Sequence, residues 1–439
     1  MAYVVGLLVL LVGLLASIAL HELGHMIPAK RFGVRVSRYM VGFGPTLWSR
    51  TRGETEYGLK AIPLGGYVRM VGMLPSAEAV GASPRAGWTG EMVQDARDAS
   101  ADEIRPGEES RAFYRLSAPK KVVVMLGGPV MNLVIAVVLL AVVLVGIGLP
   151  GAATTTVGMT LSCVLPVDAP ADRKCTEADQ PTPSAAAGLQ VGDVLLSYGG
   201  LPIETWEDFL AAVREVDGSQ IPLVVERAGE RVTLAISPIV TERPVFDEAN
   251  RTVVGEDGEI VTEPSRYIGL SPSTTLERQP VSQVVPVVGS AVWETIKLMV
   301  TLPVKLVDIA EAMFVGGERD PSIIGLVGVG RAAGEIAAAD TPGFGLAERA
   351  VRMLLLITSL NIALFVFNLI PLLPLDGGHV AGALWEGAKR QWARSRGLPR
   401  PAPADMARMM PLAYGMFLVL AAMGVFLIVA DIVRPVTIG

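Results

Sequence analysis

The chain has 439 residues, of which 51% are hydrophobic and 18% are charged, and its formal net charge is −6. Soluble proteins carry roughly 25% charged residues, so this balance indicates a membrane protein. The acidic balance and the lack of a long Lys/Arg run argue against a nucleic-acid partner.

The first apolar stretch, Met1 to Leu20, is uncharged and long enough to cross a bilayer as a helix. It lacks the basic start and the cleavage site of a secretory signal peptide, and it runs directly into polar residues. We therefore predict a retained transmembrane helix over residues 1–28.

The polar residues at the end of this span read His21-Glu22-Leu23-Gly24-His25. On a helix, His21 and His25 lie one turn apart on one face, so both imidazoles can bind one metal ion. Glu22 lies beside the first ligand, where a general base for hydrolysis is expected. A polar helix end is the alternative, but ionisable groups at a membrane are costly and usually functional. The motif predicts a zinc site.

Residues 29–121 divide into two predicted parts. From Val41 to Gly72, short apolar runs broken by glycine are typical of hairpin strands and predict a membrane-associated hairpin. From Pro75 to Ser110, small and acidic residues predominate and bulky apolar residues are few, which predicts a flexible cytoplasmic loop.

A second transmembrane helix is predicted over residues 122–149. Within it, Gly128 permits a close helix approach, and Asn132 needs a hydrogen-bonding partner in the hydrocarbon. Both residues are therefore assigned to helix packing, in preference to a direct catalytic role for Asn132.

Residues 150–279 are predicted to form an inserted extracytoplasmic α/β domain. The pattern predicts strands over 194–199, 221–227 and 231–236, and an amphipathic helix over 206–213. This order, together with Ala187-Gly188-Leu189 and Gly192-Asp193, resembles a PDZ domain.

The two cysteines of the chain, Cys163 and Cys175, both lie in this inserted domain. Their close spacing suits a disulfide in an oxidising compartment. Two unpaired thiols are the alternative.

The last third of the chain alternates apolar and basic segments. Residues 280–345 carry apolar stripes interrupted by prolines and charges, which predicts an amphipathic helix in the outer membrane interface. Further spans are predicted over 346–375 and 409–434, joined by a basic cytoplasmic loop over 376–408. By the positive-inside rule, the inserted domain and both termini then lie outside the cytoplasm.

The predicted fold class is therefore a multi-span α-helical membrane protein with four transmembrane helices, a membrane-associated β-hairpin region and one inserted PDZ-like α/β domain. The location that follows is the inner or plasma membrane.

A catalytic zinc usually takes three protein ligands, and the first motif supplies only two. The third predicted span ends in Asn368-Leu-Ile-Pro-Leu-Leu-Pro-Leu-Asp376-Gly-Gly, where prolines and glycines break the helix. Because the first and third spans run in the same direction, Asp376 should lie level with the two histidines. Asp-Gly-Gly is also a common turn sequence. Beside the first motif, however, Asp376 is the better candidate for the third ligand, and His379 is assigned to a supporting or surface position.

Taken together, the two motifs, the glycine-rich hairpin and the inserted domain resemble the site-2 protease family, and more closely its bacterial regulator-of-sigma members. The segments Phe113-Tyr-Arg-Leu, Lys120-Lys-Val-Val-Val and Gly127-Gly-Pro-Val-Met-Asn132 also resemble that family's entry into its second span. One departure is that Pro374 comes one residue later than in the usual motif, which leaves its role in doubt.

The resemblance implies an intramembrane zinc metalloendopeptidase with Zn²⁺ as cofactor. It implies Glu22 as the base and Asn368 as a group that positions substrate or stabilises the oxyanion. The implied metal ligands are His21, His25 and Asp376, and the implied substrate-binding hairpin residues are Gly65, Gly66, Tyr67 and Val68.

The implied substrates are single-span membrane proteins in the lipid bilayer, above all anti-sigma factors already trimmed by another protease. The main alternative is a non-catalytic scaffold that binds partners through the PDZ-like domain, but such a protein would typically have lost Glu22 or a ligand. A different membrane metalloprotease would supply a glutamate or histidine as its third ligand. A zinc or ion transporter would need more acidic or histidine residues in its spans.

Overall fold

The computed structural model describes residues 1–82, 87–166, 173, 175–176, 178–245, 253, 260–316, 319–320, 322–339 and 345–436. The chain forms two compact units. One consists mainly of Met1–Gly146, Pro280–Ala338 and the residues from Arg352 onward, and the other mainly of Ile147–Gln279.

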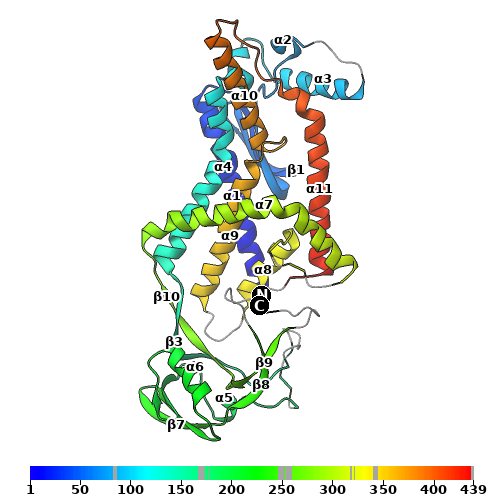
Figure 1. Ribbon diagram of the computed structural model, residues 1–439. Coiled ribbons are helices and arrows are strands. Elements are labelled where there is room, and N and C mark those ends of the chain that lie inside the picture. The colour runs from blue at the N-terminus through cyan, green and yellow to red at the C-terminus, as the bar shows by residue number, and fades with distance from the viewer. Residues whose placement is uncertain are drawn as a thin grey trace. The chain divides into compact units, whose positions relative to one another are not determined.

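Long apolar helices dominate the first unit (Figure 1). Within the described residues, five helices are long and apolar enough to cross a membrane. They are α1 (Ala2–Arg31), α4 (Ala118–Ala141, continued as a π-helix over Val142–Ile147), α7 (Val284–Phe314), α9 (Leu346–Asn368) and α11 (Met410–Val433). Four of these, α1, α4, α9 and α11, coincide with the four predicted spans.

The fifth helix, α7, occupies the region in which an amphipathic interfacial helix was predicted. It is continuous through Pro303. In Figure 1 it runs across the direction of α4 and α11 and not alongside them. A short helix, α8 (Leu326–Ala338), follows it.

Helix α8 contacts both the start of α1 and the end of α11. A side chain on Gly334 would collide with the ring of Tyr3, and Asp431 accepts hydrogen bonds from the backbone N–H groups of Gly325 and Gly328, at 3.1 and 2.7 Å. The first turn of α1 and the last turn of α11 therefore lie at the same end of this unit.

The predicted hairpin forms from β1 (Val36–Arg52) and β2 (Thr55–Met70). The pairing is irregular, because residues 38–41 lie beside both 56–59 and 66–69. Both strands must therefore bend, and glycines with positive φ, Gly42 and Gly44 in β1 and Gly65 in β2, lie at the bends. The bends leave the last part of β2, residues 66–70, at an edge of the small sheet.

Two segments predicted as loops contain helices, which contradicts the flexible loop predicted over residues 75–110. Residues 75–110 contain α2 (Ala77–Val80) and α3 (Trp88–Ala101), and residues 376–408 contain α10 (Asp376–Ser395). Helix α3 is held by a buried ion pair between Arg97 and Asp405, at 2.6 Å. Composition did not predict α3 and α10, each of which makes a charged contact with a distant segment, Arg97–Asp405 for α3 and Lys121–Glu386 for α10.

The second unit is an α/β domain. Its main sheet has the order β10-β3-β4-β6-β7, with β5 paired to β4, and a separate pair is formed by β8 and β9. The strands are β3 (Leu149–Thr160), β4 (Val194–Tyr198), β5 (Leu201–Pro202), β6 (Ile221–Arg227), β7 (Glu230–Ile236), β8 (Ile239–Pro244), β9 (Thr262–Tyr267) and β10 (Leu270–Glu277). The helices are α5 (Pro183–Ala186) and α6 (Trp206–Glu215). The strands and the helix predicted over 194–236 are all present.

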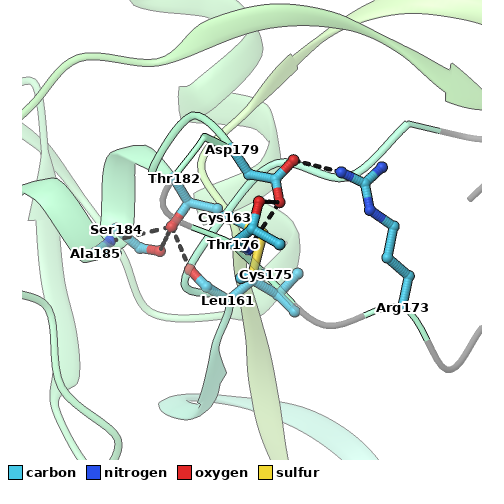
Figure 2. The surroundings of a disulfide bond; sticks show 9 residues. All are labelled: Leu161, Cys163, Arg173, Cys175, Thr176, Asp179, Thr182, Ser184 and Ala185. Atoms are coloured by element: carbon cyan, nitrogen blue, oxygen red, sulfur yellow. Dashed lines mark hydrogen bonds and ion pairs between the residues drawn. A yellow bond between two sulfur atoms is a disulfide. The ribbon is translucent and has the colours of Figure 1, made fainter.

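Asp193 and a disulfide bond link the loops of this domain to neighbouring segments. Asp193, which is 1% exposed, binds Arg227 at 2.7 Å and accepts a hydrogen bond from the backbone N–H of Gln190. Cys163 and Cys175 form a disulfide, and Figure 2 shows the Thr176–Asp179 hydrogen bonds beside it.

Candidate metal centre

Three side chains from two helices meet beside the hairpin. His21 and His25 come from the second half of α1, and Asp376 is the first residue of α10. The two Nε2 atoms lie 3.2 Å apart, and the Oδ2 atom of Asp376 lies 3.4 Å from His21 Nε2 and 3.3 Å from His25 Nε2. The three ligand atoms thus form a nearly equilateral triangle, from residues 355 positions apart in the chain (376 minus 21).

This triangle fits a tetrahedral zinc ion. Zinc–nitrogen and zinc–oxygen bonds of about 2.0–2.1 Å place tetrahedral ligands roughly 3.3–3.4 Å apart. The observed separations of 3.2–3.4 Å match that spacing. Two imidazoles and one carboxylate are also a donor set that catalytic zinc accepts while keeping a fourth position open.

Helix α4 contacts both histidines. The other ring nitrogen of His25, Nδ1, lies 2.8 Å from the carbonyl oxygen of Val124. A carbonyl can only accept, so Nδ1 carries the proton and Nε2 is left for the metal. Nδ1 of His21 is also buried, and it has no hydrogen-bonding partner among the described residues.

Glycines allow α4 to approach this closely. A side chain on Gly127 would collide with the backbone of Gly24. One on Gly128 would collide with His25 and would lie 2.7 Å from Nε2 of His21. Gly128 therefore does more than pack two helices, because it leaves the space that both imidazole rings fill. Asn132, one turn further on, is 1% exposed, and its amide has no hydrogen-bonding partner among the described residues.

The edge of the hairpin lies against Glu22, the residue that follows His21. A Cβ on Gly66 would lie 3.1 Å from Cγ of Glu22, and the backbone of Val68 interacts with the Glu22 carboxyl group. The hydroxyl of Tyr39 in β1 donates to the carbonyl oxygen of Ala19 at 2.6 Å, which ties the hairpin to α1. Among the other predicted hairpin residues, Gly65 lies at the bend, and the ring of Tyr67 stacks on Phe43 at 6.2 Å.

Two other predicted residues lie nearby in the chain. Asn368 is the last residue of α9 and is partly buried. His379 is three residues beyond Asp376 on α10, and the ligand cluster formed by the described residues does not include it.

Two polar contacts that the sequence did not predict join the helices that carry the centre to their neighbours. Asn361 in α9 donates from Nδ2 to Ser17 in α1 at 3.0 Å. Lys121 in α4 pairs with Glu386 in α10 at 2.8 Å. A lone amide inside an apolar stretch was a usable signal for Asn361, whereas the Lys121–Glu386 pair joins residues too far apart in the chain to be matched by pattern.

Comparison with known proteins decides the family. Residues 9–399 match the model of peptidase family M50. The chain belongs to this family. The resemblance to site-2 proteases is thereby confirmed, and M50 membership together with the apolar helices makes the chain a peptidase that crosses the membrane more than once.

Full-length relatives of this M50 peptidase agree with the assignment. It is 34% identical over 445 residues to the zinc metalloprotease Rip1 of Mycobacterium tuberculosis, covering 99% of each chain. It is 29% identical to the metalloprotease MmpA of Caulobacter vibrioides, over 89% of this chain and 90% of the relative. It is 25% identical to the regulator of sigma-E protease RseP of Salmonella typhimurium, over 83% of this chain and 86% of the relative.

Proposed function

We propose that this M50 peptidase is a zinc endopeptidase that cuts membrane-spanning segments of other proteins inside the bilayer. The observation that carries the proposal is the triangle of His21, His25 and Asp376, with Glu22 between the two histidines in the apolar helix α1. A peptide bond in a membrane helix is shielded from water, so its hydrolysis needs a site of this kind within the membrane.

The residues of the site have different roles in the proposed hydrolysis of a peptide bond. When bound to the three ligands, zinc supplies a Lewis acid for the scissile carbonyl and lowers the pKa of water to about 7. Glu22 takes a proton from the attacking water and returns it to the departing nitrogen of the cut peptide. Asn368 donates an amide hydrogen to the substrate backbone or to the oxyanion.

The hairpin holds the substrate in an extended form. Gly66 to Val68 lie at a sheet edge beside Glu22, and an extended peptide can add to such an edge through main-chain hydrogen bonds. Pairing with the edge would unwind the substrate helix beside the base, which exposes the peptide bond to attack.

The substrates that we propose are single-span membrane proteins, with anti-sigma factors foremost. One relative is named a regulator of sigma-E protease, which supports this class. The inserted α/β domain, which we interpret as PDZ-like, would act as a size filter that admits substrates already trimmed by another protease.

In the proposed topology, α1, α4, α9 and α11 cross the inner or plasma membrane and α7 lies in its outer interface. The basic segment from Lys389 to Arg408 supports a cytoplasmic position for the metal-centre end. The common position of the α1 start and the α11 end at the opposite end supports termini outside the cytoplasm. The disulfide between Cys163 and Cys175 supports the same side for the inserted domain.

The direct test compares wild type with Glu22→Ala, each purified in detergent with zinc. Cleavage of a single-span model substrate and the zinc content are measured for both proteins. We expect Glu22→Ala to keep its zinc and to lose cleavage by roughly 10²- to 10⁴-fold or more, because only the base is removed. Wild type without zinc, or equal cleavage by both proteins, would overturn the proposal in favour of a scaffold that binds partners through the inserted domain.

A further inference from the structure

Asp376, the third candidate ligand of the metal centre, comes from a different helix than the two histidines. His21 and His25 share α1, so their spacing is set by one helix, whereas Asp376 begins α10. The position of its carboxylate therefore depends on what holds α10 in place. Locally, Gly377 and Gly378 pack against the backbone of residues 369–373.

Further along α10, one acidic residue is buried among polar partners. Glu386 is 1% exposed, and its Oε2 atom lies 2.8 Å from Nζ of Lys121 in α4. The same oxygen accepts the backbone N–H of Ala404 at 2.9 Å, and Oε1 lies 2.8 Å from the guanidinium of Arg390. Lys121 is itself only 6% exposed. Charges buried to this extent are costly unless they are well paired, so the pair constrains the geometry strongly.

The partner of Glu386 lies on the face of α4 that holds the histidines. Lys121, Val124 and Gly128 are spaced by three and four residues, so they follow one face of the helix. Lys121 binds α10, Val124 accepts the hydrogen bond of His25, and Gly128 lies against both imidazole rings. One face of α4 thus contacts both helices that supply ligands, and it can set their relative depth.

We propose that Lys121 and Glu386 form a positioning pair for the third metal ligand, acting through α10 on Asp376. This inference rests on the proposed function, because it takes Asp376 as a ligand. Glu386 lies ten residues beyond Asp376, or about 15 Å along the helix axis, so it does not touch the metal. Its charge fixes the register of α10 on α4, and the register decides whether the carboxylate completes the triangle.

The other end of the same unit offers a matched control. Arg319 and Asp431 form a second ion pair at 2.8 Å, with side chains that are 3% and 1% exposed. Asp431 also accepts backbone N–H groups, as Glu386 does. Among the described residues, the Asp431 carboxylate contacts Arg319 and the backbone of Gly325 and Gly328. Neutralising Asp431 therefore removes an equally buried charge that has no such contact with α10 or α4.

The experiment uses the full-length protein in detergent and three forms: wild type, Glu386→Gln and Asp431→Asn. Zinc affinity is measured by competition with a chromophoric chelator, and the unfolding temperature is measured on the zinc-free proteins. We expect both variants to unfold at lower temperature, but only Glu386→Gln to bind zinc roughly 10- to 100-fold more weakly, as is typical when support of a metal ligand is lost. Unchanged zinc affinity in Glu386→Gln, or an equal loss in Asp431→Asn, would overturn the inference.

A second variant covers the case in which Glu386→Gln does not fold. In Lys121→Met/Glu386→Met apolar side chains replace both of the most buried charges, which often restores stability. Arg390, whose side chain is 18% exposed, loses its contact with Glu386 in this variant. We expect stability to recover and zinc affinity to stay reduced, whereas recovery of both would contradict a positioning role. If wild type binds zinc and cleaves its substrate, and Glu386→Gln does the same equally well, this inference is wrong. The proposed function would then still stand.

Discussion

Nδ1 of His25 donates its hydrogen to the carbonyl oxygen of Val124, 2.8 Å away, so α4 holds a proposed metal ligand that belongs to α1. Since the acceptor is a main-chain group, changing the Val124 side chain does not remove it. A shift of α4 relative to α1 or a turn of the His25 ring would break this contact. The close approach of the two helices is therefore part of the metal centre.

Replacing Gly128 by alanine tests this dependence. The added methyl group would collide with the imidazole of His25, so α4 must move away or the ring must turn. We expect zinc content and peptidase activity to fall together, by at least the roughly tenfold typical of lost support to a metal ligand. Gly424→Ala in α11 is the control, because a Cβ there meets no atom within 4 Å. Full activity in Gly128→Ala would show that the rings do not need this space.

The loss of activity on metal removal should be reversible in wild type but not in a variant that lacks one of the proposed ligands. A strong chelator is expected to abolish cleavage, and added zinc to restore it, because three protein ligands re-form the site. In Asp376→Ala only the two histidines remain, so the same zinc concentration should restore little activity. Zinc content, measured beside cleavage in each sample, distinguishes lost binding from lost chemistry. Cleavage that survives full removal of zinc would contradict a metal-dependent reaction.

The state of the substrate helix should control the rate. If the edge of β2 binds an extended peptide, the substrate must unwind first, and weak helices unwind at lower cost. Each alanine-to-glycine change near the cut weakens a helix by about 1 kcal/mol, so we expect faster cleavage of the glycine-containing substrate by up to several-fold. The two substrates are compared at matched concentration in the same detergent. Slower cleavage of the glycine form would contradict extension of the substrate at the hairpin.

The inserted domain should lose stability in acid. Burial alone would raise the pKa of Asp193, but the hydrogen bonds from Arg227 and from the Gln190 backbone outweigh it and hold the pKa below its usual range. A lowered folded-state pKa stabilises the domain above the unfolded value of about 3.9, and this contribution is lost as the pH falls further, toward the folded-state pKa. We expect the unfolding temperature of wild type to fall over that window more steeply than that of Asp193→Asn. Parallel pH profiles would show that the pair contributes nothing.

Local sequence signals predicted much of this architecture. The four apolar stretches, the strands of the inserted domain and the residues around His21 and Asp376 were all evident from composition, spacing and turn residues. The helices over residues 88–101 and 376–395 were not predicted. Each makes a charged contact with a distant segment, Arg97–Asp405 and Lys121–Glu386 respectively. Such pairs join segments hundreds of residues apart, and a single sequence does not reveal which charges meet. The role of Gly128 was likewise seen only as helix packing, because its contact with the histidines requires the depth of α4 against α1.

The separation of the ligands along the chain also affects biosynthesis. His21 and His25 leave the ribosome early, but Asp376 follows only when most of the 439 residues have been made. A nascent or prematurely terminated chain that already sits in the membrane therefore has an incomplete set of ligands. With this proposed ligand set, the site cannot be complete before α10 has been synthesised, so a chain that ends earlier would not cut the surrounding membrane proteins.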